Sequence, residues 1–292
     1  MTTTTREAAM RTFPTPHPVD VLVDVTGFDL RVRAADVAEA TVELRPHDPG
    51  KPADVELAER TTVDLVDGRL VLRSPRTVRA RLRNLVTAGP RADVSLTVPT
   101  GSSLEVRGWG DIAVRGELGA VDLDTSLGDI ALDRVGRLRA KTSMGDIRAD
   151  ATTGPADVRT SAGSIRVERA TAGLTARTAA GDVLVGHGDG ELHLTTSAGD
   201  VRVDRALASV SATTSAGDVR LGSVRRGTAT ATSSYGSIEI GIAEGTAAWL
   251  DVTTRCGAVR SELDQSDGPG DADRTVEVRA TTGFGDVVLR RS

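Results

Sequence analysis

Ten glycines recur along the chain at nearly constant spacing. Each lies in a short motif in which a variable residue precedes Gly, and Asp or Ser follows in most copies, as in TTSAGDVRV (195–203). The steps between successive glycines are 18, 17, 18, 18, 18, 18, 19, 21 and 28 residues. A fixed period of this length indicates a solenoid, and it is too short for paired-helix repeats, which need about 33 residues. The glycines are Gly110, Gly128, Gly145, Gly163, Gly181, Gly199, Gly217, Gly236, Gly257 and Gly285.

Apolar residues alternate with polar ones on both sides of each glycine. Val201 and Val203 follow Gly199 in this way, and Leu192, Leu194 and Thr196 precede it. Alternation with a period of two predicts a strand with one buried face, so each coil should carry two strands. One coil cannot bury its own apolar face, but coils stacked about 4.8 Å apart can. We therefore predict an all-β protein, a single-stranded β-solenoid of about ten coils of about 18 residues.

The glycine is expected at a tight corner between the two strands, where a positive φ or a close backbone approach is needed. The threonines just before this corner should point inward, and their hydroxyls could form a hydrogen-bonded ladder. They are Thr125, Thr142, Thr160, Thr178, Thr196 and Thr214.

One variable residue precedes each glycine. It is alanine in the central coils and larger toward both ends. In one interpretation the corner simply tapers in volume; in the other, a shallow exposed groove over the alanine coils, flanked by Trp109 and Tyr235, accepts a ligand. The residues are Trp109, Leu127, Met144, Ala162, Ala180, Ala198, Ala216, Tyr235, Cys256 and Phe284.

Carboxylates form a second column, directly after the glycines. It comprises Asp111, Asp129, Asp146, Asp182, Asp200, Asp218 and Asp286, interrupted by Ser164, Ser237 and Ala258. Stacked carboxylates repel one another, and a basic column two residues further on could neutralise them: Arg148, Arg166, Arg202, Arg220 and Arg260. We interpret these columns as a charged outer face in which Asp also caps turn amides. Because every coil repeats the same carboxylate, we predict neither a catalytic residue nor a cofactor.

Metal binding is the alternative for two groups of side chains. The ladder residues Asp182, Asp200 and Asp218 could hold calcium, although the calcium-binding pattern GGxGxDxUx is not matched. His187 and His193, in GHGDGELHL (186–194), could form an exposed metal site.

The ends of the chain are less regular than the middle. We expect a disordered tail over 1–12, a β-rich cap over 13–108 with a short basic helix at 75–90, and the solenoid over 109–292 with a loop insertion at 262–275. Cap and solenoid should form one cooperative unit, since a solenoid must cover its open edge strands. The C-terminal coil at 276–292 has little sequence left to cover it, which predicts either a monomer or a dimer through this edge.

Composition excludes several protein classes. The net charge is -5 and aromatic residues make up 2% of the chain, which is atypical of a nucleic-acid-binding protein. The single cysteine, Cys256, allows no internal disulfide. The N-terminal segment has no apolar signal-peptide core, and no stretch approaches the ~18 apolar residues of a transmembrane helix. We expect a cytoplasmic location unless export follows another route.

The stretch VPTGSSLEVRGWGDI (98–112), the TSxGD repeats and the final TTGFGDVVLRRS (281–292) resemble the bacterial β-strand-repeat proteins called putative adhesins, of actinobacterial type. The resemblance covers the chain from about residue 13. It implies a right-handed β-helix and transfers no catalytic residue. The expected function is a non-enzymatic scaffold or adhesin-like module that binds a protein or a surface polymer and no nucleic acid. The alternatives are a carbohydrate-active β-helix protein and a polymerising, bactofilin-like cytoskeletal element.

Overall fold

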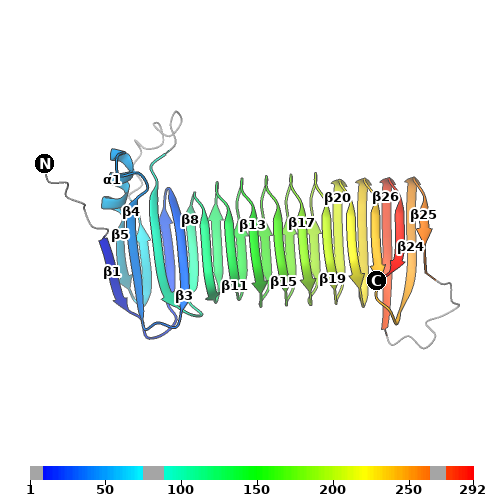
Figure 1. Cartoon of the computed structure of the whole chain (residues 1–292), viewed down its shortest axis with the longest axis horizontal. Helices are drawn as coiled ribbons and strands as arrows, with labels where there is room; N and C mark the ends of the chain where they lie inside the picture. Colours follow the sequence, from blue (N-terminus) through cyan, green and yellow to red (C-terminus); the bar gives the residue numbers. More distant parts are fainter. Residues whose placement is uncertain (1–8, 75–88, 264–273) are drawn as a thin grey trace. The chain divides into compact units, whose positions relative to one another are not determined.

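The computed structural model describes residues 9–74, 89–263 and 274–292. By its contacts the chain divides into two compact units, Met1–Gly136 and Arg137–Ser292. The sequence placed the boundary between cap and solenoid earlier, at residue 108. Each unit is built from two β-sheets, and several of its strands are labelled in Figure 1.

Unit 2, residues 137–292, has the predicted solenoid architecture: every strand pairs in parallel with its equivalents in neighbouring coils. The strands that follow the corner glycines form one sheet, in the order β13 (Ile147–Thr152), β15 (Ile165–Ala170), β17 (Val183–Gly188), β19 (Val201–Ala206), β21 (Val219–Val224), β23 (Ile238–Ile242), β27 (Val287–Arg291) and β25 (Val259–Ser261). The strands that precede the glycines form the other sheet, in the order β12 (Leu138–Lys141), β14 (Ala156–Arg159), β16 (Leu174–Arg177), β18 (Leu192–Thr195), β20 (Val210–Ala216), β22 (Gly227–Tyr235), β26 (Arg274–Phe284) and β24 (Thr246–Cys256).

The core of unit 2 is a set of apolar ladders between these sheets. Val183, Val201 and Val219 stand in register on successive coils and are fully buried. Outward positions between them, such as Arg202, are exposed. The period of 18 keeps each apolar residue above its equivalent, so the stack buries a face that one coil alone would leave in water.

The last coils of unit 2 do not stack in chain order. The final strands β26 and β27 pair with β22 and β23, and β24 and β25 then pair on their other side. The outermost coil is therefore residues 246–261. The prediction that residues 276–292 form the free edge is wrong, because this segment lies between two other coils.

Unit 1, residues 1–136, combines parallel coils with antiparallel strands. Its first sheet has the order β1 (Ala9–Pro14), β4 (Glu39–Pro46), β7 (Ala92–Pro99), β3 (Phe28–Ala35), β9 (Ile112–Leu118) and β11 (Ile130–Val135). The second has the order β10 (Val121–Thr125), β8 (Ser103–Gly108), β2 (Asp20–Val25), β6 (Arg69–Arg73) and β5 (Thr62–Val66). Strand β4 runs antiparallel to β1 and β7, and β5 runs antiparallel to β6.

The cap differs from the sequence prediction in two places. Residues 9–12, expected in a disordered tail, belong to β1, because β1 completes its backbone hydrogen bonds against β4. A helix that was not predicted, α1 (Pro52–Arg60), follows β4. Most of the helix expected at 75–90, and most of the loop expected at 262–275, lie outside the described residues. Among the described helices there is none long and apolar enough to cross a membrane.

Candidate functional site

The corner of each coil is held by glycine for two reasons. The ten corner glycines have φ between 121° and 155°, a region that residues with a side chain rarely adopt. At Gly199 a Cβ atom would lie 2.2 Å from the carbonyl oxygen of Gly181 on the adjacent coil. The corners therefore stack backbone on backbone, and the residue before each glycine is carried to the outside.

The threonines before the corner point inward and are buried, as the alternation indicated. Their hydroxyls form a ladder, but with different partners from those expected. Thr178, for example, donates to the carbonyl oxygen of Gly163 at 2.9 Å, and Thr196 donates to that of Gly181 at 2.9 Å. Thr160, Thr214, Ser233, Thr254 and Thr282 repeat the bond. Each of these seven hydroxyls thus satisfies a corner carbonyl rather than another hydroxyl. Two predicted members of the ladder differ: Thr142 donates to the carbonyl oxygen of Met144 at 3.1 Å, and the buried hydroxyl of Thr125 has no partner among the described residues.

The aspartate column is held by the main chain. One carboxylate oxygen of Asp182 accepts a hydrogen bond of 2.9 Å from the backbone N–H of Asp200, and Asp200 accepts one of 2.8 Å from Asp218. The same bond joins Asp111 to Asp129, Asp146 to Ser164, Asp218 to Ser237 and Asp286 to Ala258. A charge-assisted bond from an amide stabilises each of these six carboxylates and compensates the repulsion along the column.

The arginine column contributes less than we expected. Arg148 and Arg260 reach the ladder residues Asp146 and Asp286, at 3.5 and 3.3 Å. The other three arginines form their described ion pairs with different carboxylates: Arg166 with Glu168, Arg202 with Asp204 and Arg220 with Glu239. Exposed pairs of this kind are worth about 0–1 kcal/mol, so the inter-coil amides are the main compensation.

We predict that millimolar calcium will change the thermal midpoint by less than about 1 °C. A Ca²⁺ ion needs six to eight oxygen ligands, whereas the ladder carboxylates are already bound to amides of the next coil. Differential scanning fluorimetry with calcium and with a chelator tests this. A rise of several degrees that the chelator reverses would make the ladder a metal site.

The histidines predicted as metal ligands lie in different sheets. His187 is half-buried on β17, and His193 is exposed on β18, 3.3 Å from Glu191. Within the described residues, the structure gathers another trio of metal-ligating types, Asp29, His47 and Asp93 in unit 1.

Sequence reasoning missed this trio. Asp29 and Asp93 stand opposite each other on β3 and β7, and His47 Nδ1 lies 2.9 Å from Asp93 Oδ1. Arg91 binds Asp29 and lies 5.9 Å over the ring of Trp109. Arg91 and His47 thus already bind the two carboxylates of the cluster, and we assign no metal to it. The available signal was the repeated apolar-Asp start of FDLRVRA (28–34) and ADVSLTVP (92–99).

A shallow depression lies on the outer face of β15, β17 and β19. It is lined by Leu184 and by the pairs Arg166–Glu168 and Arg202–Asp204. The hydrogen bond from Arg166 to Glu168, together with the charge of that carboxylate, raises the pKa of Arg166. Both carboxylates have the same kind of partner, whereas general acid–base chemistry needs two carboxyl groups in unlike environments.

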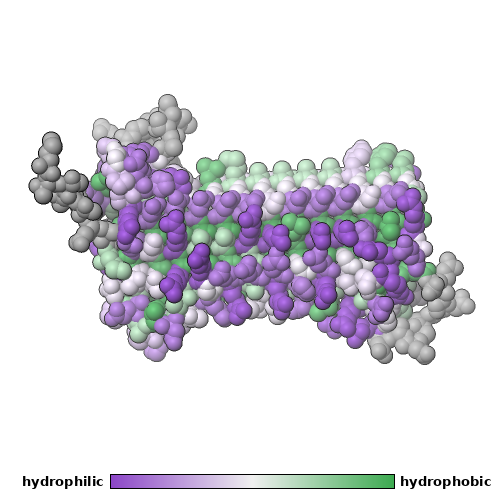
Figure 2. Space-filling model, viewed as in Figure 1, coloured by the Kyte–Doolittle hydropathy of each residue, from purple (hydrophilic) through white to green (hydrophobic). Residues whose placement is uncertain are grey.

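The variable residues before the corner glycines line up on the surface of unit 2. We call them the corner ridge: Met144, Ala162, Ala180, Ala198, Ala216, Tyr235, Phe284 and Cys256, in spatial order. All eight are exposed, Met144 by 54%, Tyr235 by 62% and Phe284 by 49%. Figure 2 shows an apolar band along the upper edge of this unit. Seven steps of about 4.8 Å make the ridge about 34 Å long.

Larger side chains stand at both ends of the alanines. Met144 precedes them, and the rings of Tyr235 and Phe284 stack in parallel planes with centroids 5.1 Å apart after them. Trp109, expected to flank the groove, is half-buried in unit 1 beneath Arg91. The alanine stretch is therefore bounded within unit 2 by Met144 and by the Tyr235–Phe284 pair.

A family model described as Toastrack DUF4097 matches residues 20–265. None of the curated proteins compared with the chain matches it.

Solved structures that align with nearly the whole chain share little sequence with it. A putative adhesin from Bacteroides fragilis is 13% identical, with 97% of each chain covered and a TM-score of 0.36. A putative lipid binding protein from Parabacteroides distasonis is 12% identical, covering 99% of this chain and 98% of its own, with a TM-score of 0.45. A putative cell adhesion protein from Clostridium sporogenes is 10% identical, covering 98% and 100%, with a TM-score of 0.22.

Proposed function

The chain belongs to the Toastrack family DUF4097, and we propose that it is a non-enzymatic, adhesin-like module that binds a protein partner along its corner ridge. The observation that carries this proposal is the exposure of eight mostly apolar side chains in one line. Monomeric proteins rarely expose a contiguous apolar patch of several hundred Å², and such patches typically mark interaction sites.

The chemistry of the ridge favours a protein over a sugar polymer. The backbone groups of the alanines are already used between coils: Ala180 N–H donates to Ser161, and its carbonyl accepts from Gly163. The central ridge therefore offers methyl groups and few free donors or acceptors. A sugar needs many hydrogen-bond partners, whereas an apolar helix face or strand can lie along a row of methyl groups.

The charged surroundings support a binding role rather than catalysis. Six of the seven ladder carboxylates accept the same bond from the next coil, so none of these six is distinguished from the others. The ridge itself carries one nucleophilic side chain, the exposed Cys256. Within the described residues no histidine or carboxylate is grouped with it in a metal-ligating or ion-paired cluster.

A photo-crosslinking amino acid placed at Ala180 or Ala198 tests the proposal in the native cell. We expect both positions to capture the same protein partner, because they lie on one continuous ridge. The matched control is Arg202, which is exposed on the same coil as Ala198 but faces away from the ridge. The substitution Ala216→Glu should reduce crosslinking of the partner from position 198 at least about tenfold while leaving the thermal midpoint of the protein unchanged.

Equal capture from Arg202 would contradict a ridge-specific site. Absence of any crosslinked product from both alanine positions would contradict the proposed function.

A further inference from the structure

We propose that the terminal edge of unit 2, strands β24 and β25, pairs with the same edge of a second copy to form a two-fold dimer. This edge is a different surface from the corner ridge, which it meets only at Cys256, and the proposal follows from the order of the last coils. Among the described strands, β24 pairs only with β26, and β25 pairs only with β27. Their other sides present backbone donors and acceptors that any matching strand can bond.

The terminal edge also leaves the apolar interior of the solenoid open. Leu250 is in register with Val278, yet Leu250 is 42% exposed and Val278 is fully buried. Val259 is 48% exposed, whereas its equivalent Val287 is fully buried. These side chains have the inward positions of a core but no coil covers them in the described structure.

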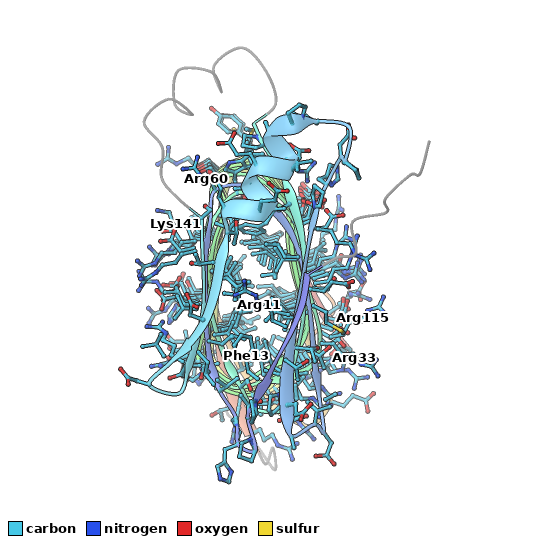
Figure 3. The ribbon with its side chains drawn as sticks, turned by 90° about the vertical axis from the view of Figure 1, so that its left-hand side faces the viewer. Arg11, Phe13, Arg33, Arg60, Arg115 and Lys141 are labelled. Atoms are coloured by element: carbon cyan, nitrogen blue, oxygen red, sulfur yellow. The ribbon has the colours of Figure 1, made fainter. Side chains whose placement is uncertain are left out.

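The outer strands of unit 1, β1 and β5, are joined by a hydrogen bond that has no equivalent at the terminal edge in the described residues. Arg11 of β1 reaches between the two sheets and donates from Nη1 to the carbonyl oxygen of Val63 on β5 at 2.8 Å (Figure 3). The side chain of Val63 is buried. This bond ties the two outer strands of unit 1 together, and no equivalent bond between β24 and β25 occurs in the described residues.

The corner of the terminal edge favours antiparallel pairing over another parallel coil. In most inner coils of unit 2, an Asp or Ser side chain accepts an amide of the next coil, but Ala258 at the terminal edge has no acceptor atom in its side chain. A parallel coil stacked on β25 would lose this bond. An antiparallel strand has a different amide pattern and does not need it.

The charges of β24 complement one another in one antiparallel register. If two copies pair with Thr253 at the centre, Asp251 of each copy stands opposite Arg255 of the other. In this register the inward-facing residues of both copies lie on the same face of the joined sheet. Asp251 and Arg255 are both exposed, and neither forms an ion pair within the described part of the chain. Opposite charges directly across an antiparallel pair are stabilising.

The end face is large enough for a stable dimer. A strand of 11 residues spans about 36 Å, and two sheets with their outer side chains are about 20 Å deep. The face therefore offers about 700 Å² per copy, close to the roughly 800 Å² of a standard interface.

Sedimentation equilibrium of the full chain from about 1 to 100 μM tests the proposal. We expect a dimer, and we expect Leu250→Lys to raise its dissociation constant at least about tenfold. The single reversals Asp251→Arg and Arg255→Asp should each weaken it by a similar factor, because each places like charges opposite one another. The double reversal should restore dimerisation, since it exchanges the two charges in the same register.

Arg177→Asp is the matched control, because Arg177 is an exposed outward residue on β16, far along the sheet from β24. It should leave the dissociation constant unchanged. A monomer at every concentration would overturn the proposal, as would a dimer that Leu250→Lys leaves intact. A mass that keeps growing with concentration would replace it with head-to-tail polymerisation, and a double reversal that fails to restore the dimer would overturn the Thr253-centred register.

Discussion

Replacing Gly199 with alanine should lower the free energy of unfolding by about 3–5 kcal/mol. The residue has a φ of 144°, and forcing a side chain into this region costs about 1–3 kcal/mol. The new Cβ would also lie 2.2 Å from the Gly181 carbonyl oxygen and 2.9 Å from a carboxylate oxygen of Asp182. Relieving this collision requires the stacked corners to separate, which adds a cost similar to that of overpacking a core. Urea denaturation followed by circular dichroism measures the change.

Substitutions at two other glycines distinguish the cost of backbone strain from the cost of the Cβ collision. Gly245 has a φ of 70° but open space around its Cβ position, so Gly245→Ala should cost about 1 kcal/mol from the backbone alone. At Gly173 no such φ occurs and the nearest atom would lie 3.6 Å away, so Gly173→Ala should be nearly neutral. Equal losses at all three positions would show that the corner contact is unimportant.

The repeat itself could be predicted from the sequence because its physical causes are local. A glycine every 18 residues marks a corner, and alternation around it fixes which side chains face inward. The alternation alone therefore assigns residues such as Val201 and Thr196 to the interior, and both are buried in the fold. The exposure of the ridge alanines follows from the same corner, because the turn at each glycine places the preceding residue on the outside.

The partners of the polar ladders were harder to predict, because they depend on the distance between coils. The Thr196 hydroxyl has a corner carbonyl of the adjacent coil within 2.9 Å, and this carbonyl is a better acceptor than another hydroxyl. The carboxylate of Asp200 likewise meets an amide of the next coil before it meets an arginine. The sequence shows the columns but not which atoms of adjacent coils face each other.

The order of the last coils was not predicted, because the strands of different coils have the same alternation of apolar and polar residues. Both β24 and β26 show the alternation of a coil strand, so the pattern alone does not show which of the two pairs with β22. A signal was nevertheless present in the carboxylate column. Ala258 is the ladder position without an acceptor, and the structure places it where no further described coil donates an amide. The long step of 28 residues before Gly285 agrees with a chain that turns back over one coil.

The cap was the least predictable part because its strands follow no period. Asp29, His47 and Asp93 come together only after β4 has turned antiparallel beside β7. Nothing in the spacing of these three residues indicates that turn.

Deleting residues 274–292 should remove two coils from the folded protein rather than one. Strands β24 and β25 remain in that chain, but β26 and β27, on which they pair, are gone. We expect the amides of β24 that are bonded to β26 to lose hydrogen-exchange protection by about two orders of magnitude or more, because they no longer have a folded partner. If coils stacked in chain order, β24 would instead remain protected against β22.

The matched variant deletes residues 246–273 and keeps the final strands. Thr246 and Arg274 occupy the same register position, so Arg274 can follow Gly245 as Thr246 does. After the deletion the step from Gly236 to Gly285 is 21 residues, the same as the step from Gly236 to Gly257. Strand β26 should then stay paired with β22, and hydrogen exchange should show both strands as well protected as in the full chain. Loss of protection in β26 would mean that the terminal coil is needed to hold it. Retention in this variant, together with loss of β24 protection in the other, would establish that the last strands of the chain lie between the two preceding coils.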